Sequence, residues 1–270
     1  MRVPLPFSAL VPVHNEAPIL ADTLTRMVDG LRTLGAPFEI DVCENGSTDG
    51  SLAEAQALQA AHPEIRVHHS AVADYGLALR HGTAVARHDA IVVYNLDFWS
   101  LDFTRDALAA LRTADVVIGS KAMAGARDHR PLLRRWITRG FNGGLRLVFG
   151  FRGTDTHGMK AMRRSAVLPI LGACVTTSWM LDTELVLRAE RRGLTVVEIP
   201  VEIREVRARG YGAILARVPR VLRSLVTLWR ALRHAPRTHA GHAAAGPLHT
   251  DVPPNPPAEA PLLRHDRGSV

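Results

Sequence analysis

The sequence is poor in lysine and has no long apolar segment, and both shortages narrow its possible functions. Only Lys121 and Lys160 are lysines among the 33 basic residues of this 270-residue chain, whose net charge is +7. Arginine, which makes up the rest, suits bidentate contact with phosphate, although GC-rich coding produces the same bias. No run of eighteen apolar residues occurs, so the sequence predicts no segment that spans a bilayer.

Cysteine is also scarce, since Cys43 and Cys174 are the only two. They form neither a CxxC pair nor a metal-ligand spacing, and two unpaired thiols indicate a reducing compartment. The N-terminus, MRVPLPFSALVPV, is broken by proline too early for a signal peptide. We therefore expect a cytoplasmic protein, whose apolar content of 47% is ordinary for a globular fold.

The first hundred residues alternate between strand and helix patterns. Apolar and β-branched runs predict strands at 7–13, 38–43, 65–68 and 91–93, and helical spacing predicts helices at 17–34, 51–61 and 75–86. Later patterns predict helices at 102–111 and 178–192 and strands at 115–119 and 196–203. The last strand is expected at an edge, because it contains Pro200. This alternation predicts an α/β fold with a mostly parallel sheet covered on both faces.

Polar clusters follow three of these strands. PVHNE (12–16) follows the first strand, ENGSTDG (44–50) the second and NLD (95–97) the fourth. Each cluster alone is explained by turn formation, but the carboxyl ends of parallel strands meet at one edge, where open α/β sheets bind ligands. Asp97 is suited to a divalent cation, which would in turn hold a diphosphate.

The three clusters together resemble family-2 glycosyltransferases of the GT-A fold, over roughly residues 7–212. The resemblance implies a nucleotide sugar as donor, with the 44–47 loop on base and ribose. It also implies Mg²⁺ or Mn²⁺ and the diphosphate at the NxD, with Asp97 as the metal ligand. The donor contacts that it implies are Pro12, His14, Asn15, Glu16, Glu44, Asn45, Ser47, Asp49, Arg80 and Asn95.

The chain departs from the family pattern at three points. Glu44 stands where Asp is usual, and Asn95 replaces the first Asp of the DxD. The basic residue that usually precedes Gly76 is missing, with Asp74-Tyr75 in its place. Because Asn95 removes a negative charge, we expect weaker metal binding than the family pattern implies.

Residues 121–153 mix arginine with aromatic residues. Leu132–Val148 is predicted to form one helix with an apolar and a basic stripe, which fits either a core-packed helix with solvated arginines or a surface that meets lipid phosphate. The segment PLLRRWITRGFN resembles dolichol-phosphate mannose and glucose synthases. That resemblance implies that Arg135 and Arg139 lie beside the acceptor phosphate.

Two acidic residues, Asp182 and Glu184, lie on the predicted helix 178–192. They are two positions apart, about 200° around the helix, so both cannot face one cleft. Glu184 has an alternative role in an i,i+4 pair with Arg188. A phosphate acceptor needs no general base, whereas a hydroxyl acceptor would use Asp182 or Glu184.

Two residues of the DTHGMK segment are also candidates for a role at the site. We expect His157 to be a hydrogen-bonded structural histidine rather than a metal ligand. Asp155 either lies near the bound sugar or caps a turn, and both readings stay open.

The C-terminal part divides into an amphipathic helix and a tail. Val218–His234 carries apolar and arginine faces, which suits either a membrane interface or packing on the domain's own core. Residues 235–270, rich in Pro, Ala and His, are predicted to be disordered. We therefore divide the chain into a GT-A domain (1–212), an amphipathic helix (213–234) and a disordered tail (235–270).

These features favour an inverting transfer of sugar from a nucleotide sugar to a polyprenyl phosphate or another membrane-associated acceptor. The protein would then be peripheral at the inner face of the membrane. The alternative is a GT-A domain that has lost turnover and serves as a membrane-surface partner subunit, which Asn95 favours. Nucleic acid is a poor partner, because the arginines lie beside apolar residues and no recognition motif is present. The nucleotide, the sugar and the oligomeric state stay open.

Overall fold

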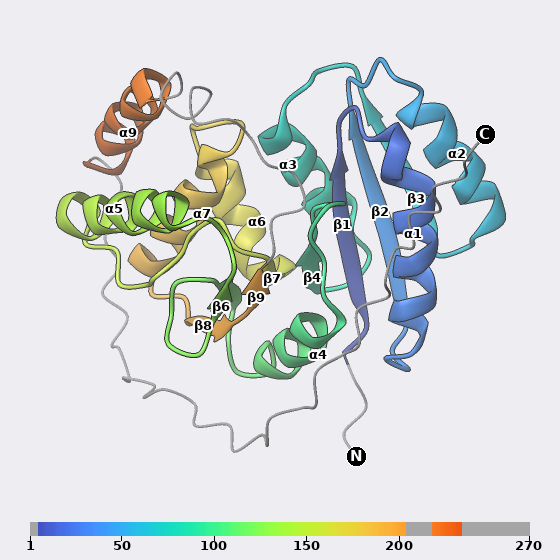
Figure 1. Cartoon of the computed structure of the whole chain (residues 1–270), viewed down its shortest axis with the longest axis horizontal. Helices are drawn as coiled ribbons and strands as arrows, with labels where there is room; N and C mark the ends of the chain where they lie inside the picture. Colours follow the sequence, from blue (N-terminus) through green and yellow to red (C-terminus); the bar gives the residue numbers. More distant parts are fainter. Residues whose placement is uncertain (1–4, 204–217, 234–270) are drawn as a thin grey trace, which may run out of the picture. The chain divides into compact units, whose positions relative to one another are not determined.

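The structure, a computed structural model, describes residues 5–203 and 218–233. Its centre is a seven-stranded sheet in the order β3-β2-β1-β4-β7-β5-β8 (Figure 1). The strands of this sheet are β1 (Phe7–Val13), β2 (Phe38–Asn45), β3 (Ile65–Ser70), β4 (Ala90–Val93), β5 (Val116–Ser120), β7 (Lys160–Arg163) and β8 (Val196–Pro200). The helices are α1 (Ala17–Arg32), α2 (Ser51–Ala61), α3 (Tyr75–Val85), α4 (Leu101–Ala110), α5 (Leu132–Phe149), α6 (Arg164–Ala173), α7 (Met180–Arg191) and α9 (Val218–Arg233).

The sheet is mostly parallel, as the sequence predicts. β1 pairs in parallel with β2 and β4, and β5 pairs in parallel with β8. β7 is the exception, because it runs antiparallel between β4 and β5. The sequence pattern does not predict β7, because its four residues KAMR contain no β-branched side chain. The pattern does not predict α6 either, because α6 has Pro169 inside it, and proline disfavours a helix interior.

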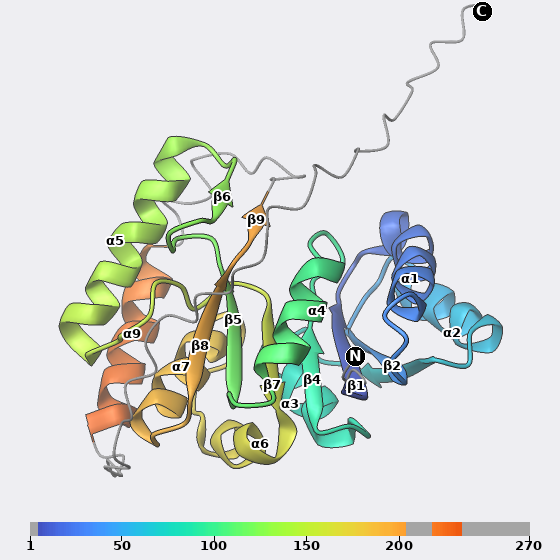
Figure 2. The ribbon, with the colours of Figure 1, turned by 90° about the horizontal axis from the view of Figure 1, so that it is seen from below.

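The predicted last strand is divided in two. β8 lies at the edge of the main sheet, as Pro200 suggests, and ends there. The chain then pairs β9 (Glu202–Ile203) with β6 (Arg127–Asp128) in a separate two-stranded sheet. Figure 2 shows this small sheet beside the N-terminal end of α5. β6, which leads into α5, is therefore paired with the strand that follows β8.

Two apolar cores cover the two faces of the sheet. Alternate residues of β1 belong to different cores: Ala9 and Val11 face α1, α2 and α4, and Leu10 faces the other helices. This alternation is the period of two expected of a strand. Both cysteines, Cys43 and Cys174, are buried and unpaired. Burial raises the pKa of each thiol to about 12, so neither is a ready nucleophile.

α9 forms where the amphipathic helix is predicted, and the structure divides its apolar face. Leu228 and Leu232 are buried in the second core, whereas Leu222 and Trp229 are exposed by 57% and 40%. Arg191 of α7 donates to the carbonyl oxygens of Leu232 and Phe149, which links the ends of α9 and α5. One side of α9 thus packs on the domain and another faces outward. The predicted disordered tail lies outside the described residues.

Candidate functional site

The loops after β1 and β2 are joined by hydrogen bonds between side chains and backbone. The Asn15 N–H donates to Ser47 Oγ at 3.0 Å, and the Thr48 N–H donates to Asn15 Oδ1 at 2.8 Å. Asn15 has a φ of 55°, a left-handed conformation that asparagine tolerates better than most residues. Asn15 and Ser47, both expected at the nucleotide, therefore also fix the shape of the loops that would hold it.

Asp49 joins the same two loops at the starts of two helices. Its carboxylate accepts hydrogen bonds from the Ala17 N–H of α1 and from the Ser51 N–H and hydroxyl of α2. The Ser51 hydroxyl also accepts the Glu16 N–H at 2.9 Å. Hydrogen bonds, the one from the Ser51 hydroxyl above all, hold the pKa of Asp49 below its usual value. We call Asn15, Ser47, Asp49 and Ser51 the loop staple.

Glu44 and Asn45 turn inward beneath these loops. The Glu44 carboxylate is fully buried, accepts the Ser47 N–H at 2.6 Å and contacts the His69 ring at Nδ1. Burial opposes its ionisation, but the hydrogen bonds from Ser47 and His69 hold the pKa of Glu44 below its usual value. The Asn45 amide donates to the Val13 carbonyl oxygen at 2.7 Å. His14 is exposed, and its Nδ1 lies 2.8 Å from the Asn45 carbonyl oxygen.

The NxD segment forms a turn that presents Asn95 and Asp97. Tyr94 and Leu96 are buried at 1% and 5% exposure and anchor the turn, which Asn95 and Phe98 close by backbone hydrogen bonds. The side chains of Asn95 and Asp97 are exposed. A carboxylate and an amide oxygen are ligands that Mg²⁺ and Mn²⁺ accept. The turn therefore fits such a cation.

The protein alone supplies few ligands at this turn. Within residues 5–203 and 218–233, no three His, Cys, Asp or Glu side chains are grouped as a metal site. A cation at Asp97 would need further oxygens from a diphosphate or water.

A buried lysine that no sequence motif identifies, Lys160, lies beside β4, the strand that leads into this turn. Lys160 of β7 is opposite Val93 of β4, and its Nζ lies 3.2 Å from Asp182 Oδ2 and 3.0 Å from the Gly158 carbonyl oxygen. The Tyr75 hydroxyl donates to both oxygens of Asp182. Burial and the Asp182 charge raise the pKa of Tyr75 well above its usual value. The one feature of the sequence that distinguishes Lys160 is that it is one of only two lysines in the chain.

Glu184 points into the protein, away from its neighbour Asp182, in agreement with their angular separation. Its side chain is 0% exposed, and its carboxylate accepts bonds from the Val175 and Thr176 backbone and from Arg188 Nε at 2.7 Å. The predicted i,i+4 pair is therefore present, and no lone pair is left for a substrate. The structure favours this ion-pair role over the role of general base.

Arg80 bonds to the segment just before α7, to which Glu184 also bonds. Its Nη2 donates to the carbonyl oxygens of Cys174 and Thr176 at 2.7 and 3.1 Å. These contacts favour a structural role for Arg80 over the nucleotide contact that the resemblance implies.

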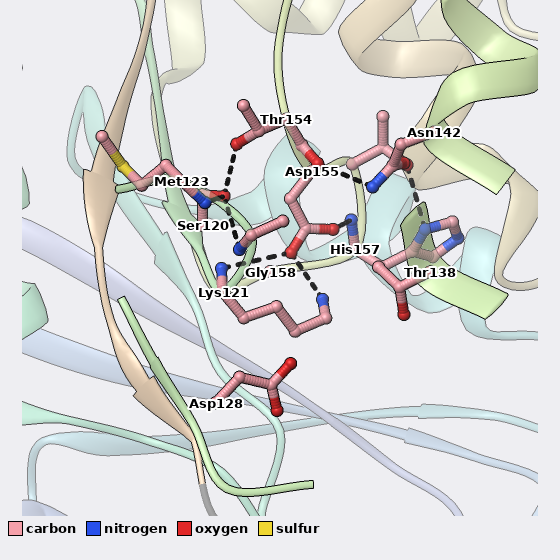
Figure 3. A network of polar contacts seen from close by, with 12 residues as sticks. Ser120, Lys121, Met123, Asp128, Thr138, Asn142, Thr154, Asp155, His157 and Gly158 are labelled. Atoms are coloured by element: carbon pink, nitrogen blue, oxygen red, sulfur yellow. Dashed lines mark hydrogen bonds and ion pairs between the residues drawn. The ribbon is translucent and has the colours of Figure 1, made fainter. Parts of the chain in front are cut away.

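Asp155 and His157 lie in a second buried network (Figure 3). Lys121 Nζ lies 2.5 Å from Asp155 Oδ2, and the backbone N–H of His157 donates to Asp155 Oδ1 at 3.0 Å. Burial opposes both charges, yet the Lys121 ammonium holds the pKa of Asp155 below its usual value. Burial lowers the pKa of the Lys121 ammonium. Asp155 thus caps a turn and pairs with Lys121, which accounts for its carboxylate without a sugar.

His157 is held as a neutral ring. Its Nδ1 lies 2.9 Å from Thr156 Oγ1, and its ring contacts Phe141 and Trp179 with centroid distances of 5.6 and 5.3 Å. Burial lowers its pKa to about 4. This environment is that of a structural histidine, as expected from the sequence.

The N-terminal half of α5 packs little against the domain. Its buried residues are Asn142, Leu145 and Phe149, all in its C-terminal half. Arg139 is exposed and lies 5.9 Å from the centroid of the Trp136 ring, whereas Arg135 is half-buried. The exposed large apolar residues of α5 are Leu132, Leu133, Trp136, Ile137, Leu147 and Val148.

α5 and α9 lie side by side in both views (Figure 1, Figure 2). The residues of these two helices include no Asp or Glu. None of the helices in the described ranges has the length and apolar character needed to cross a bilayer. We call the exposed apolar side chains of α5 and α9, together with the exposed Arg139, Arg223 and Arg230, the arginine–apolar surface.

Comparison with known proteins places this site in a family. The pattern of glycosyl transferase family 2 matches residues 8–170, so the chain belongs to this family. The matched range contains the loop staple and the Asn95–Asp97 turn.

Two curated relatives show how far the similarity extends. Glycosyltransferase AglD of Haloferax volcanii is 30% identical over 202 residues, covering 72% of this chain and 32% of that protein. Undecaprenyl-phosphate mannosyltransferase of Micrococcus luteus is 28% identical over 239 residues, covering 83% of this chain and 96% of that protein. The chain thus spans about a third of the Haloferax protein and nearly all of the Micrococcus protein.

A solved structure confirms the fold. Glucosyl-3-phosphoglycerate synthase of Mycobacterium tuberculosis, in complex with Mn²⁺, UDP and phosphoglyceric acid, superposes with a TM-score of 0.63. It is 18% identical, and the match covers 83% of this chain and 78% of that protein. At this identity the likeness shows the fold alone, which is the mixed α/β architecture expected from the sequence.

Proposed function

We propose that this protein transfers a sugar, with inversion, from a nucleotide sugar to a polyprenyl phosphate or another membrane-borne acceptor. The observation that carries the proposal is the arginine–apolar surface on a family-2 domain. A relative that covers most of the chain is an undecaprenyl-phosphate mannosyltransferase. Apolar side chains and arginines side by side suit a substrate with a hydrocarbon tail and a phosphate head.

The donor binds at the carboxyl edge of β1, β2 and β4. The loop staple holds the two loops that enclose the nucleoside, and the Asn95–Asp97 turn faces the diphosphate. A divalent cation bound at Asp97 would neutralise the charge that develops on the leaving diphosphate. Lys160, which lies opposite Val93 and so two residues in register from that turn, is paired with Asp182 and links the turn to α7.

The acceptor approaches from the side of α5. Arg139 is exposed and free to turn toward an acceptor phosphate, and Arg135 stands one turn before it. A phosphate monoester is ionised at neutral pH and attacks without a general base. For a hydroxyl acceptor, Asp182 is the remaining candidate base, because the Glu184 carboxylate is saturated by its own hydrogen bonds. Asp182 would have to exchange its contact with Lys160 or Tyr75 for the acceptor hydroxyl.

We propose Mn²⁺ or Mg²⁺ as the cofactor. Mn²⁺ accompanies UDP in the mycobacterial synthase, and the oxygen donors of the Asn95–Asp97 turn fit either ion. We further propose that the arginine–apolar surface docks on anionic lipid at the cytoplasmic face of the membrane, because clustered surface arginines are attracted to such lipid.

A transfer assay tests the function. Purified full-length protein is incubated with UDP-, GDP- or dTDP-sugars, Mn²⁺ and undecaprenyl phosphate in anionic vesicles, and the lipid-linked sugar is measured. Asp97→Ala is expected to remove the product, whereas Asp29→Ala, an exposed acidic residue of α1, is the matched control. Absence of transfer with every donor and with soluble hydroxyl acceptors would contradict the proposal.

The alternative, a domain that has lost turnover, is favoured by Asn95 alone. It predicts donor binding without product. A thermal-shift measurement separates the two outcomes, since a ligand at 100 times its Kd stabilises the fold by about 2.7 kcal/mol.

A further inference from the structure

Glu44 cannot itself contact a donor nucleotide in this structure. Its carboxylate is 0% exposed, with one oxygen on the Ser47 N–H and the other on the ring of His69. Both oxygens are thus committed inside the protein. The residue that would be expected to meet the nucleoside is instead buried beneath the loop.

His69 is the exposed end of this pair. It lies directly opposite Glu44 in the register of β3 and β2, and its side chain is 48% exposed. Only its Nδ1 contacts Glu44, and Nε2 makes no hydrogen bond within the described part of the chain. The preceding histidine, His68, is different, because its Nε2 is bound to the buried Asp41 at 2.8 Å.

His69 also lies next to the point where the loops after β2 and β3 meet, at the proposed nucleoside site. Gly46 has a φ of +66°, and its N–H donates to the Ser70 carbonyl oxygen at 2.7 Å. A Cβ on Gly46 would lie 3.0 Å from the Ala71 carbonyl oxygen. The loop after β3 is therefore closed against the loop after β2, and His69 precedes this junction by one residue.

We propose that His69, oriented by Glu44, reads the base of the donor nucleotide in this chain. This rests on the proposed use of a nucleotide sugar. An ionised carboxylate only accepts hydrogen bonds, so the neutral ring carries its proton on Nδ1 and leaves Nε2 as an acceptor. Nε2 then accepts the ring N–H of uracil, thymine or guanine. Cytosine and adenine offer a lone pair at the corresponding ring position, so they are disfavoured.

Calorimetric titration with methylated nucleotides tests the contact directly. UDP and N3-methyl-UDP, and GDP and N1-methyl-GDP, are compared on the full chain with Mn²⁺. Methylation removes the proposed donor, and we expect the preferred nucleotide to bind about tenfold more weakly once methylated.

His69→Asn isolates the role of Nε2. Asparagine can still donate to Glu44 from a position like that of Nδ1, so folding is preserved, but it has no counterpart of Nε2. The methylation penalty should fall below about threefold. His68→Asn, on the same strand, is the matched control and should keep the full penalty. A penalty that persists in His69→Asn would overturn the proposal.

Glu44→Gln tests the orienting role. The amide oxygen keeps the Ser47 N–H, and the amide N–H then faces Nδ1, which forces the ring proton onto Nε2. The preference for UDP over CDP should fall or reverse, while the melting temperature in the absence of ligand changes little. An unchanged preference would show that Glu44 does not position His69.

The outcomes distinguish the two proposals. If wild-type protein binds no nucleoside diphosphate, the proposed glycosyl transfer falls and this contact falls with it. If it binds UDP or GDP but the penalty is independent of His69, or if CDP or ADP binds best, only the role of His69 is lost.

Discussion

The loop staple and the charged side chains beside β5 and β7 use polar groups in different ways. At the ends of β1 and β2, the loop staple consists of side chains that bond to the backbone of a neighbouring loop. Beside the end of β5 and the start of β7, charges are buried in pairs, Lys121 with Asp155 and Lys160 with Asp182. The first arrangement shapes a loop at little desolvation cost, whereas the second depends on each partner being present.

This contrast indicates different tolerances to mutation. Backbone contacts in the loop staple are several and shared, so the loss of one leaves the others. A buried ion pair has no other contacts to compensate, because removal of one partner leaves the other charge buried and unpaired. We therefore expect larger stability losses from breaking the buried pairs beside β5 and β7 than from removing one contact of the loop staple.

The largest effect is expected for Lys121→Met. It leaves the Asp155 carboxylate buried without its cation, and breaking such a pair costs about 3–5 kcal/mol. Urea unfolding of the variant and of wild type measures the loss. Ser51→Ala, in the loop staple, removes the hydroxyl that bonds Asp49 and the Glu16 N–H and should cost only about 1 kcal/mol, as for other hydrogen bonds. If Ser51→Ala cost as much as Lys121→Met, the contrast between the loop staple and the buried pairs would be wrong.

The sign of the pH effect follows from the lowered pKa of Asp155. A carboxyl whose pKa is lower in the folded state contributes stability above its unfolded pKa. That contribution is lost as pH falls through the folded value. The difference between wild type and Lys121→Met should therefore shrink below pH 4.

A second effect, of roughly a hundredfold, is expected on the membrane. Changing the exposed Arg139, Arg223 and Arg230 to Ser should weaken binding to anionic vesicles by about 3 kcal/mol, because each surface arginine contributes on the order of 1 kcal/mol. The measurement is co-sedimentation at low and high salt, since salt screens the attraction. The matched control changes the exposed arginines of α1 and α4, Arg26, Arg32 and Arg105. Equal losses in both variants would remove the special role of the arginine–apolar surface.

His157 should make the β5–β7 side sensitive to acid. Its pKa in the folded state is about 4, below the usual value of 6.5. Between these two pH values the unfolded state binds a proton at His157 and the folded state does not. Stability should fall as pH falls from 6.5 to 4, by roughly 3 kcal/mol in total. His157→Gln should remove this part of the pH dependence. Its retention in that variant would assign the dependence to another group.

The sequence was most informative where contacts are local. The strands and helices up to α4, and the polar clusters that end β1, β2 and β4, follow from periodicity and turn chemistry. β7 could not be found this way, because KAMR becomes a strand only between β4 and β5. The role of Lys160 could not be predicted for the same reason. The insertion of β7 places the Lys160 side chain beside Asp182, which belongs to a separate element.

The inward turn of Glu44 was also beyond the sequence. Its resemblance to the family's Asp implied contact with the nucleoside, but the longer side chain reaches back to Ser47 and across to His69. Which of these directions it takes depends on the strand that lies alongside. The same limit applies to Arg80, whose partners Cys174 and Thr176 are distant in the chain.

The smallest effect that we expect is a gain at the Asn95–Asp97 turn. Asn95→Asp restores a second carboxylate to an exposed pair, and more ligand charge tightens binding of a hard cation. With nucleotide present, Mn²⁺ should bind about tenfold more tightly, a difference of about 1.4 kcal/mol. Asp97→Asn is the reciprocal variant and should weaken Mn²⁺ by a similar or larger factor. Because both side chains are exposed, neither change should alter urea unfolding by more than about 0.5 kcal/mol. Titration of Mn²⁺ into the nucleotide complex measures all three proteins. Weaker metal binding by Asn95→Asp would mean that the amide serves another ligand, and the turn would no longer be a DxD site that lacks one charge.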